Sequence, residues 1–188
     1  MGNGISGGDE YFWLAGRNSG NGRGNFARRD PEKVAFATRG DTIVGMIKPE
    51  KYITRVSDKY FVSENERFLY VKFELVLPDR INYQAGQYVS FKINEQGERR
   101  CYSIASTPDD HHGFHILAEM VVGGKGSDFL KNIKLGEEVE VLAPLGRFVV
   151  QKNQKTKESE NQSKLLFVAT GSGIVPIYAM INDLLINK

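Results

Sequence analysis

Between residues 48 and 150, hydrophobic and polar residues alternate in short segments. The clearest case is residues 69–77, LYVKFELVL, in which every second position from Leu69 to Leu77 is hydrophobic. A period of two is typical of a β-strand with one buried face. The same reasoning, together with turn residues between the segments, predicts further strands over Tyr52–Val62, Val89–Ile93, Arg100–Ile104, Phe114–Val122 and around Val139–Val141.

One short helix is expected among these strands. Ser127 stands at an N-cap position, Asp128 lies in the first turn, and the hydrophobic pattern stops before Gly136, so the predicted helix runs over Ser127–Ile133. Several short strands separated by turns, with only one brief helix between them, predict a closed antiparallel barrel. The expected fold class is therefore mainly β, with six antiparallel strands and one short helix.

The pattern changes after residue 150. Residues 151–163 are all polar, which predicts a linker. Leu165–Ala169 is continuously hydrophobic, as in a parallel strand buried on both faces, and Gly171–Gly173 precedes a predicted helix over Ile174–Ile186. A strand, a glycine turn and a helix open a doubly wound α/β nucleotide-binding domain, of which only the first of about four or five parallel strands is present.

Four regions follow from these patterns. Residues 1–46 hold half of the 20 glycines and are expected to be largely disordered; residues 47–151 form the barrel, 152–163 the polar linker, and 164–188 the start of a truncated nucleotide-binding domain. The first region also admits two other interpretations. Met1–Ser6 matches an N-myristoylation pattern, and the Gly/Arg-rich stretch 17–29 could contact RNA, although an inert tail is favoured.

Composition narrows the function classes. A formal net charge of +2 indicates no nucleic-acid surface, and no hydrophobic run approaches the roughly 20 residues of a membrane helix, so stable membrane insertion is not expected and the default location is cytoplasmic. The single cysteine, Cys101, excludes an internal disulfide. His111, His112 and His115 lack further ligands at metal-binding spacings, which favours a solvated loop over a metal site.

Three local patterns carry candidate chemistry. Arg100-Cys101-Tyr102-Ser103 on a strand places Arg100 and Tyr102 on one face, where they could bind a phosphate and stack on a flat ring. Gly123–Ser127 offers glycine backbone amides, a helix N-terminus and the Lys125 charge as a diphosphate cradle. Ala169–Pro176 satisfies the strand–glycine–helix context of a dinucleotide turn, which the tail segment Gly2–Gly7 does not. Each pattern alone also fits an ordinary strand or turn.

Together and in this order, the motifs resemble the ferredoxin–NADP reductase superfamily from about Lys48 onward. The four matching segments are RCYS for its flavin motif, GGKGS for its phosphate loop, APLGRF for the closing segment of its barrel, and ATGSGIVP for its nucleotide loop. The resemblance implies a flavin-binding barrel that carries FAD, with FMN as the second possibility, and NAD(P)H as the co-substrate of the complete enzyme.

The resemblance also implies roles for individual residues. Tyr102 would stack on the flavin ring, and Ser103, the one catalytic candidate, would hydrogen-bond near the flavin nitrogen that accepts hydride. Arg100 with Gly124, Lys125, Gly126 and Ser127 would hold the phosphates. Thr170 would close on the flavin, and Gly171, Ser172 and Gly173 would meet the nicotinamide dinucleotide. Glu119 departs from the family, in which many members have a basic residue here, so we expect its carboxylate to face away from the phosphates.

The function expected from the resemblance is the flavin-binding part of an NAD(P)H-dependent oxidoreductase. It would pass electrons to a redox partner protein such as ferredoxin or an oxygenase component. The alternative is a flavin-binding module without its own reductase activity, paired with a separate nucleotide-binding half. A third interpretation is a barrel-type interaction domain that binds no flavin.

Overall fold

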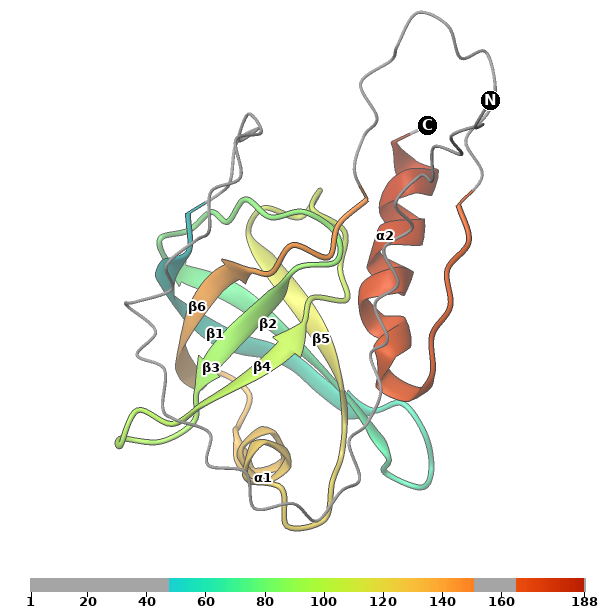
Figure 1. The fold of residues 1–188 in the computed structure, drawn as a ribbon. Coiled ribbons are helices and arrows are strands. Elements are labelled where there is room, and N and C mark those ends of the chain that lie inside the picture. The colour runs from blue at the N-terminus through green and yellow to red at the C-terminus, as the bar shows by residue number, and fades with distance from the viewer. Residues whose placement is uncertain (1–47, 151–164, 188) are drawn as a thin grey trace, which may run out of the picture. The chain divides into compact units, whose positions relative to one another are not determined.

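The computed structural model describes residues 48–150 and 165–187 (Figure 1). The predicted tail 1–46, with its myristoylation and RNA-binding interpretations, and the predicted linker 152–163 lie outside the described residues. The first described part holds six strands and one helix, and the second holds a 3-10 turn and a helix. In chain order these are β1 (Glu50–Phe61), β2 (Phe68–Leu77), β3 (Tyr88–Lys92), β4 (Arg99–Ser103), β5 (Gly113–Glu119), α1 (Lys125–Asn132), β6 (Glu138–Leu145), η2 (Gly171–Gly173) and α2 (Ile174–Ile186).

The six strands form one antiparallel sheet in the order β4-β3-β6-β1-β2-β5. Strand β1 lies near the middle and pairs with both β2 and β6, with Tyr60 opposite Tyr70 and Tyr52 opposite Val141. The six predicted strands and their antiparallel arrangement are therefore confirmed. β1 has 12 residues and pairs along its two edges, with β6 over its first half and with β2 over the rest.

The sheet is not closed, which corrects the expectation of a closed barrel. Strands β4 and β5 are its two edges, and an isolated bridge connects Ile104, just after β4, with Ile116 in the middle of β5. All five residues of β4 pair with β3, and β4 forms no ladder with β5. Helix α1 instead packs beside β4, with Gly126 against Arg100 and Tyr102.

The hydrophobic core lies on the inner face of this sheet. The predicted alternation is observed in β2, where Leu69, Val71 and Phe73 are fully buried. The Phe73 ring packs 4.8 Å from Phe91 and 5.5 Å from Phe114, measured between ring centroids. The alternation fails at the end of β2, because Leu77 is 68% exposed. There the pairing with β1 shifts its register between Ile53 and Thr54, which disrupts the regular inward and outward alternation.

Helix α1 starts at Lys125, two residues earlier than predicted. Ser127 is not its N-cap: its hydroxyl accepts a hydrogen bond from the Val121 N–H at 2.8 Å and so ties the preceding turn to the helix. The first helical turn is closed by the Asp128 N–H, which donates to the Gly124 carbonyl at 2.9 Å. Leu130 is fully buried and anchors the helix on the core.

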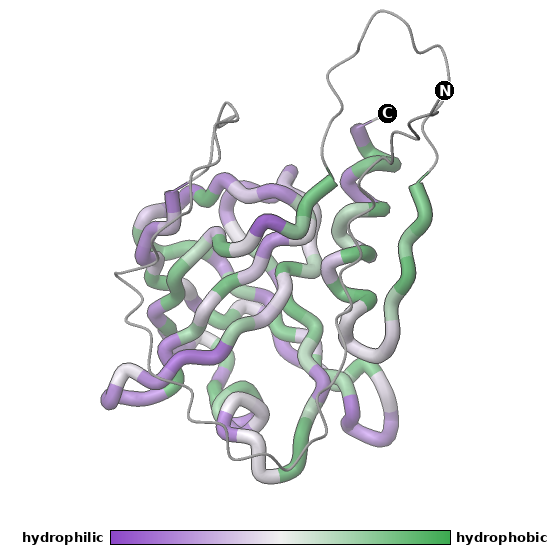
Figure 2. The backbone as a smooth tube through the Cα atoms, in the orientation of Figure 1, coloured by the Kyte–Doolittle hydropathy of each residue, from purple (hydrophilic) through white to green (hydrophobic). Residues whose placement is uncertain are grey.

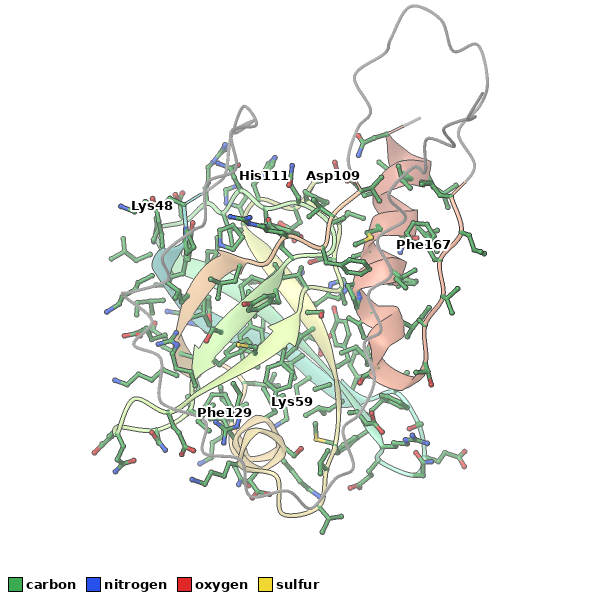
Figure 3. The ribbon with its side chains drawn as sticks, viewed as in Figure 1. Lys48, Lys59, Asp109, His111, Phe129 and Phe167 are labelled. Carbon is green, nitrogen blue, oxygen red and sulfur yellow. The ribbon has the colours of Figure 1, made fainter. Side chains whose placement is uncertain are left out.

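The C-terminal end of α1 is fixed by a lysine on β1. The Lys59 ammonium donates to the carbonyl oxygens of Lys131 at 2.8 Å and Ile133 at 2.6 Å. Figure 3 shows Lys59 close to α1, the helix that carries Phe129. These carbonyls have no partner within the helix, and a cation there also complements the negative end of the helix dipole. Burial lowers the pKa of the Lys59 ammonium, and the nearby Glu137 opposes that shift.

In residues 165–187 the predicted helix is present, but the predicted strand is not. Helix α2 has the predicted bounds, and its Ala179 and Met180 are buried against Ala85. Residues 165–169 are hydrophobic throughout (Figure 2) but form no strand, and Leu166 is 90% exposed. A parallel strand needs a hydrogen-bonded neighbour, and no described residue supplies one here.

Replacing Lys59 tests how α1 is held. Lys59→Met keeps the aliphatic stem but removes both hydrogen bonds to the helix end, so we expect the free energy of unfolding to fall by about 1–2 kcal/mol. Urea unfolding followed by circular dichroism measures this change. Lys51→Met, which alters an exposed lysine of the same strand, is the control and should change stability by less than about 0.5 kcal/mol. Equal effects of the two variants would contradict the account.

Candidate cofactor site

The register between β3 and β4 determines which way the RCYS residues face. Arg100 lies opposite Phe91 and Tyr102 lies opposite Val89, and both of these β3 side chains are fully buried. Directly opposed residues of an antiparallel pair share a face of the sheet. Arg100 and Tyr102 therefore lie together on the inner side, as the sequence predicted, while Ser103 lies opposite Tyr88 on the other side.

Tyr102 presents a firmly held aromatic ring at the edge of the core. The residue is half-buried, and its ring meets Phe91 edge-on with 5.8 Å between the ring centroids. Burial raises the pKa of the Tyr102 hydroxyl, with the Arg100 charge acting in the opposite direction. The phenol is therefore protonated at neutral pH, and its aromatic ring is of the type that stacks on another flat group.

The first turn of α1 is seated directly on this pair. Gly126 is buried, and a Cβ at this position would overlap the Tyr102 hydroxyl and stand 3.1 Å from Cγ of Arg100. Only glycine therefore allows the helix to approach β4 this closely. The approach brings Gly124, Lys125 and Ser127 to the same place as Arg100 and Tyr102, so five of the predicted cofactor residues form one cluster with Gly126.

The two cations of the cluster converge on a single carboxylate. Glu98 Oε1 lies 3.1 Å from the Arg100 guanidinium, and Glu98 Oε2 lies 2.9 Å from the Lys125 ammonium. Asn94 also donates its side-chain amide to Glu98 Oε2 at 2.9 Å. The hydrogen bond from Lys125 is the largest cause that holds the pKa of the Glu98 carboxyl below its ordinary value, and burial opposes it.

Sequence reasoning missed Glu98. The signal that could have found it is its position two residues before Arg100, which places both side chains on one side of an extended chain. It went unnoticed because an acidic residue is not expected beside a phosphate-binding arginine. The pairing with Lys125 spans 27 residues, and only the position of α1 against β4 brings these residues together.

Glu119, the departure from the family pattern, is engaged by a neighbouring strand. Its carboxylate lies 3.1 Å from the Arg67 guanidinium, and its side chain is only 12% exposed. The ion pair follows from the sheet register, because Phe68, next to Arg67, lies opposite Glu119. The charge that would repel a phosphate is thus balanced by Arg67.

The predicted nucleotide turn lies apart from the cluster of Arg100, Tyr102 and Gly124–Ser127. Thr170, Gly171 and Ser172 are exposed, and Gly171 has a φ of +54°, which favours glycine. The nearest atom that a Cβ on Gly171 would meet is Oε2 of Glu119, at 4.0 Å. The structure therefore brings Arg100, Tyr102 and Gly124–Ser127 together, and it places the turn beside the end of β5.

The cluster has the chemistry that a flavin dinucleotide needs. Arg100 and Lys125 already share one anionic group, which shows that both can reach the same negative charge. Gly126 allows the start of α1 to lie directly against Arg100 and Tyr102, and Tyr102 adds the aromatic ring. A phosphate next to a flat heterocycle fits this combination of groups.

Comparison with known proteins agrees with this chemistry. Residues 54–150, just over half of the chain, match the family described as oxidoreductase FAD-binding domain. The chain belongs to this family, within the ferredoxin–NADP reductase superfamily. FAD is therefore its cofactor, as the motif order implied.

Two relatives and one solved structure illustrate the likeness. The reductase component DmpP of phenol 2-monooxygenase, from Pseudomonas sp. strain CF600, is 31% identical over 137 residues, which are 72% of this chain and 36% of that protein. The CDP-6-deoxy-L-threo-D-glycero-4-hexulose-3-dehydrase reductase of Yersinia pseudotuberculosis is 32% identical over 145 residues, covering 76% of this chain and 40% of that protein. The Amycolatopsis cytochrome P450 reductase GcoB has the same fold, with a TM-score of 0.63 at 23% identity over 73% of this chain and 40% of that one.

The chain thus spans about two fifths of the length of these relatives. In the described ranges 48–150 and 165–187, no helix is long and apolar enough to cross a membrane. The same ranges contain no group of three or more His, Cys, Asp or Glu side chains placed to hold a metal ion.

The contact at Gly126 gives a direct test of the site. Gly126→Ala should displace Tyr102 and weaken FAD binding about tenfold, since overpacking a tight contact costs on the order of 1–3 kcal/mol. Tyr102→Phe removes the hydroxyl that the new methyl group would overlap while keeping the ring.

Adding Tyr102→Phe to Gly126→Ala should therefore restore most of the lost affinity, measured by quenching of flavin fluorescence. Tyr102→Phe alone is the control and should bind close to the parent. The account is wrong if the double variant binds no better than Gly126→Ala.

Proposed function

We propose that this chain is the flavin-binding part of an NAD(P)H-dependent oxidoreductase, which passes electrons between a nicotinamide cofactor and an acceptor. The observation that carries the proposal is the convergence of Arg100 and Lys125 on one anionic group beside Tyr102 and Gly126. It occurs in a chain that belongs to an FAD-binding oxidoreductase family.

The names of the relatives support the kind of acceptor. One is a reductase component of phenol 2-monooxygenase, and another is a ferredoxin–NADP reductase of Sorangium cellulosum. The first name describes the reductase component of a monooxygenase, and the second describes a reductase that acts with ferredoxin. By analogy we infer a protein partner, such as ferredoxin or an oxygenase component, for the complete form of this protein.

The roles of the site residues follow from their charges and positions. Arg100 and Lys125 hold the phosphates, with the backbone amides of Gly124–Ser127 at the helix start as further donors. Tyr102 contributes its ring to stacking. Ser103 lies on the other side of the β3–β4 pair, opposite Tyr88, and its hydroxyl hydrogen bond to the flavin edge is assigned from the family resemblance alone. Bound FAD supplies the redox chemistry by accepting hydride and releasing electrons. The protein therefore needs to bind, orient and shield rather than to provide a nucleophile.

The nucleotide half of the proposal rests on the turn at residues 170–173. Thr170, Ser172 and the two glycines precede α2 and lie beside Glu119 of β5. We assign this turn to the nicotinamide dinucleotide, residues 47–151 to the flavin domain, and residues 164–188 to the start of a nucleotide-binding domain. The location that fits this soluble electron-transfer role is the cytoplasm.

One observation favours the alternative of a flavin-binding module without its own reductase activity. Residues 165–169 form no strand, so the described nucleotide-binding part consists of a turn and one helix. The flavin cluster, in contrast, is assembled within residues 98–127. Flavin binding and nicotinamide oxidation are therefore separable properties of this chain.

Two substitutions test the flavin assignment. Arg100→Ala removes a charge-assisted phosphate contact of about 1.5–3 kcal/mol, so FAD affinity should fall roughly 10- to 150-fold. Tyr102→Ala removes ring stacking worth on the order of 1 kcal/mol beyond buried area, so affinity should fall at least fivefold. Binding is measured by titration of the chain with FAD.

Matched controls exist on β1. Arg55→Ala breaks the exposed ion pair with Glu138, and Tyr60→Ala removes a half-exposed ring stacked on Tyr70. Both should bind FAD like the parent. If Arg100→Ala and Tyr102→Ala also bind like the parent, the site is misassigned. If the parent itself binds no FAD, the function is misassigned.

Nicotinamide oxidation tests the second half of the proposal. Hydride transfer needs the nicotinamide held about 3–3.5 Å from the acceptor atom, and the turn at residues 170–173 supplies only one side of such a site. We therefore expect the FAD-loaded 188-residue chain to be reduced by NADH or NADPH far more slowly than about 1 per second. Stopped-flow absorbance at about 450 nm, where flavins absorb, measures the rate. Rapid bleaching with either nucleotide would contradict this expectation.

A further inference from the structure

The proposed phosphate site contains an anion of the protein's own. Glu98 contacts both cations of the cluster: its carboxylate oxygens lie 2.9 Å and 3.0 Å from the Lys125 ammonium and 3.1 Å from the Arg100 guanidinium. These are the two side chains that the proposed function assigns to the flavin phosphates. A phosphate oxygen prefers the same donors at the same distances as a carboxylate oxygen.

Glu98 is held in this position by its own turn. The Glu98 N–H donates to Oδ1 of Asn94 at 2.9 Å, and the Asn94 side-chain amide donates to Glu98 Oε2. The Ile93 N–H donates to the Glu98 carbonyl at 2.8 Å and closes the hairpin between β3 and β4. Because the turn fixes the backbone of Glu98, its carboxylate is directed at the cations by local structure as well as by charge.

We propose that Glu98 is an internal substitute for the flavin phosphate, which FAD must displace from Arg100 and Lys125 when it binds. The inference rests on the proposed function. The carboxylate offsets the repulsion between the two cations, because it pairs with both. On binding, the same carboxylate competes with the phosphate and opposes it as a like charge. Glu98 therefore lowers the affinity for phosphorylated flavins and leaves the ring contacts of Tyr102 unaffected.

The exposure of the three side chains limits how strongly Glu98 can compete with the phosphate. Both ion pairs are partly exposed, with side-chain exposures of 34% for Glu98, 39% for Arg100 and 65% for Lys125. Exposed pairs contribute little individually because solvent screens them. Losing two of them, together with one repulsive charge, should change flavin affinity by about five- to tenfold.

The experiment compares three flavins that differ in phosphate content: FAD, FMN and riboflavin. Glu98→Gln keeps the shape of the side chain and removes its charge. We expect it to bind FAD and FMN about five- to tenfold more tightly than the parent, and riboflavin no differently. Fluorescence titration measures all three affinities, and thermal melting confirms that the variant is folded.

Glu95→Gln is the matched control, since Glu95 is an exposed residue of the same turn and its replacement changes the net charge equally. It should leave the affinity for FAD close to that of the parent. Lys125→Met provides a second check. In that background Glu98→Gln should give a smaller gain, because one of the two ion pairs is already absent.

The outcomes separate the inference from the function on which it rests. If the parent binds FAD but Glu98→Gln binds it equally or more weakly, Glu98 is no competitor and the inference is overturned. An equal gain for riboflavin, or the same gain in Glu95→Gln, overturns it as well. A parent that binds none of the three flavins overturns the proposed function and the inference with it.

Discussion

The close approach of the α1 N-terminus to β4 is the contact on which the site depends. It is possible because Gly126 has no side chain, so the helix backbone can meet the Tyr102 hydroxyl and the Arg100 stem directly. Leu130 on the core and Lys59 at the other helix end keep α1 in this position. The Tyr102 ring, the two cations and the helix amides come from β4 and from the start of α1. They meet only because these two elements pack together.

The electrostatics of the site follow from the same contact. Bringing α1 onto β4 places two cations near each other, which is unfavourable unless an anion lies between them. Glu98 provides that anion from the adjoining turn. The arrangement links folding and binding, because the charges that would attract a phosphate are already balanced when no cofactor is bound. Preorganised groups favour binding, whereas the proposed competition from the Glu98 carboxylate opposes it.

Much of the sheet could be predicted from sequence because burial on one face imposes a period of two. In β2, for example, the alternating residues Leu69, Val71 and Phe73 are all buried. The open edge between β4 and β5 could not be predicted, because alternation shows which face of a strand is buried but not which strands pair. The strand expected over Leu165–Ala169 was wrong because hydrophobicity marks burial but supplies no hydrogen-bonding neighbour. Ser127 was misplaced as a cap because its hydroxyl bonds to Val121, a contact set by the turn before the helix.

The motifs of the candidate site could be predicted from the sequence, but the Glu98 carboxylate between its two cations could not. Arg100, Tyr102 and the glycine loop are residue types that commonly bind phosphates and flat rings. The role of Glu98, in contrast, follows from its contact with Lys125, 27 residues away in the sequence. A crystal structure of the FAD-loaded chain tests the central claim most directly. The account predicts the diphosphate within hydrogen-bond distance of both Arg100 and Lys125, with the Glu98 carboxylate released from them. A diphosphate bound elsewhere, with Glu98 still bridging the two cations, would contradict it.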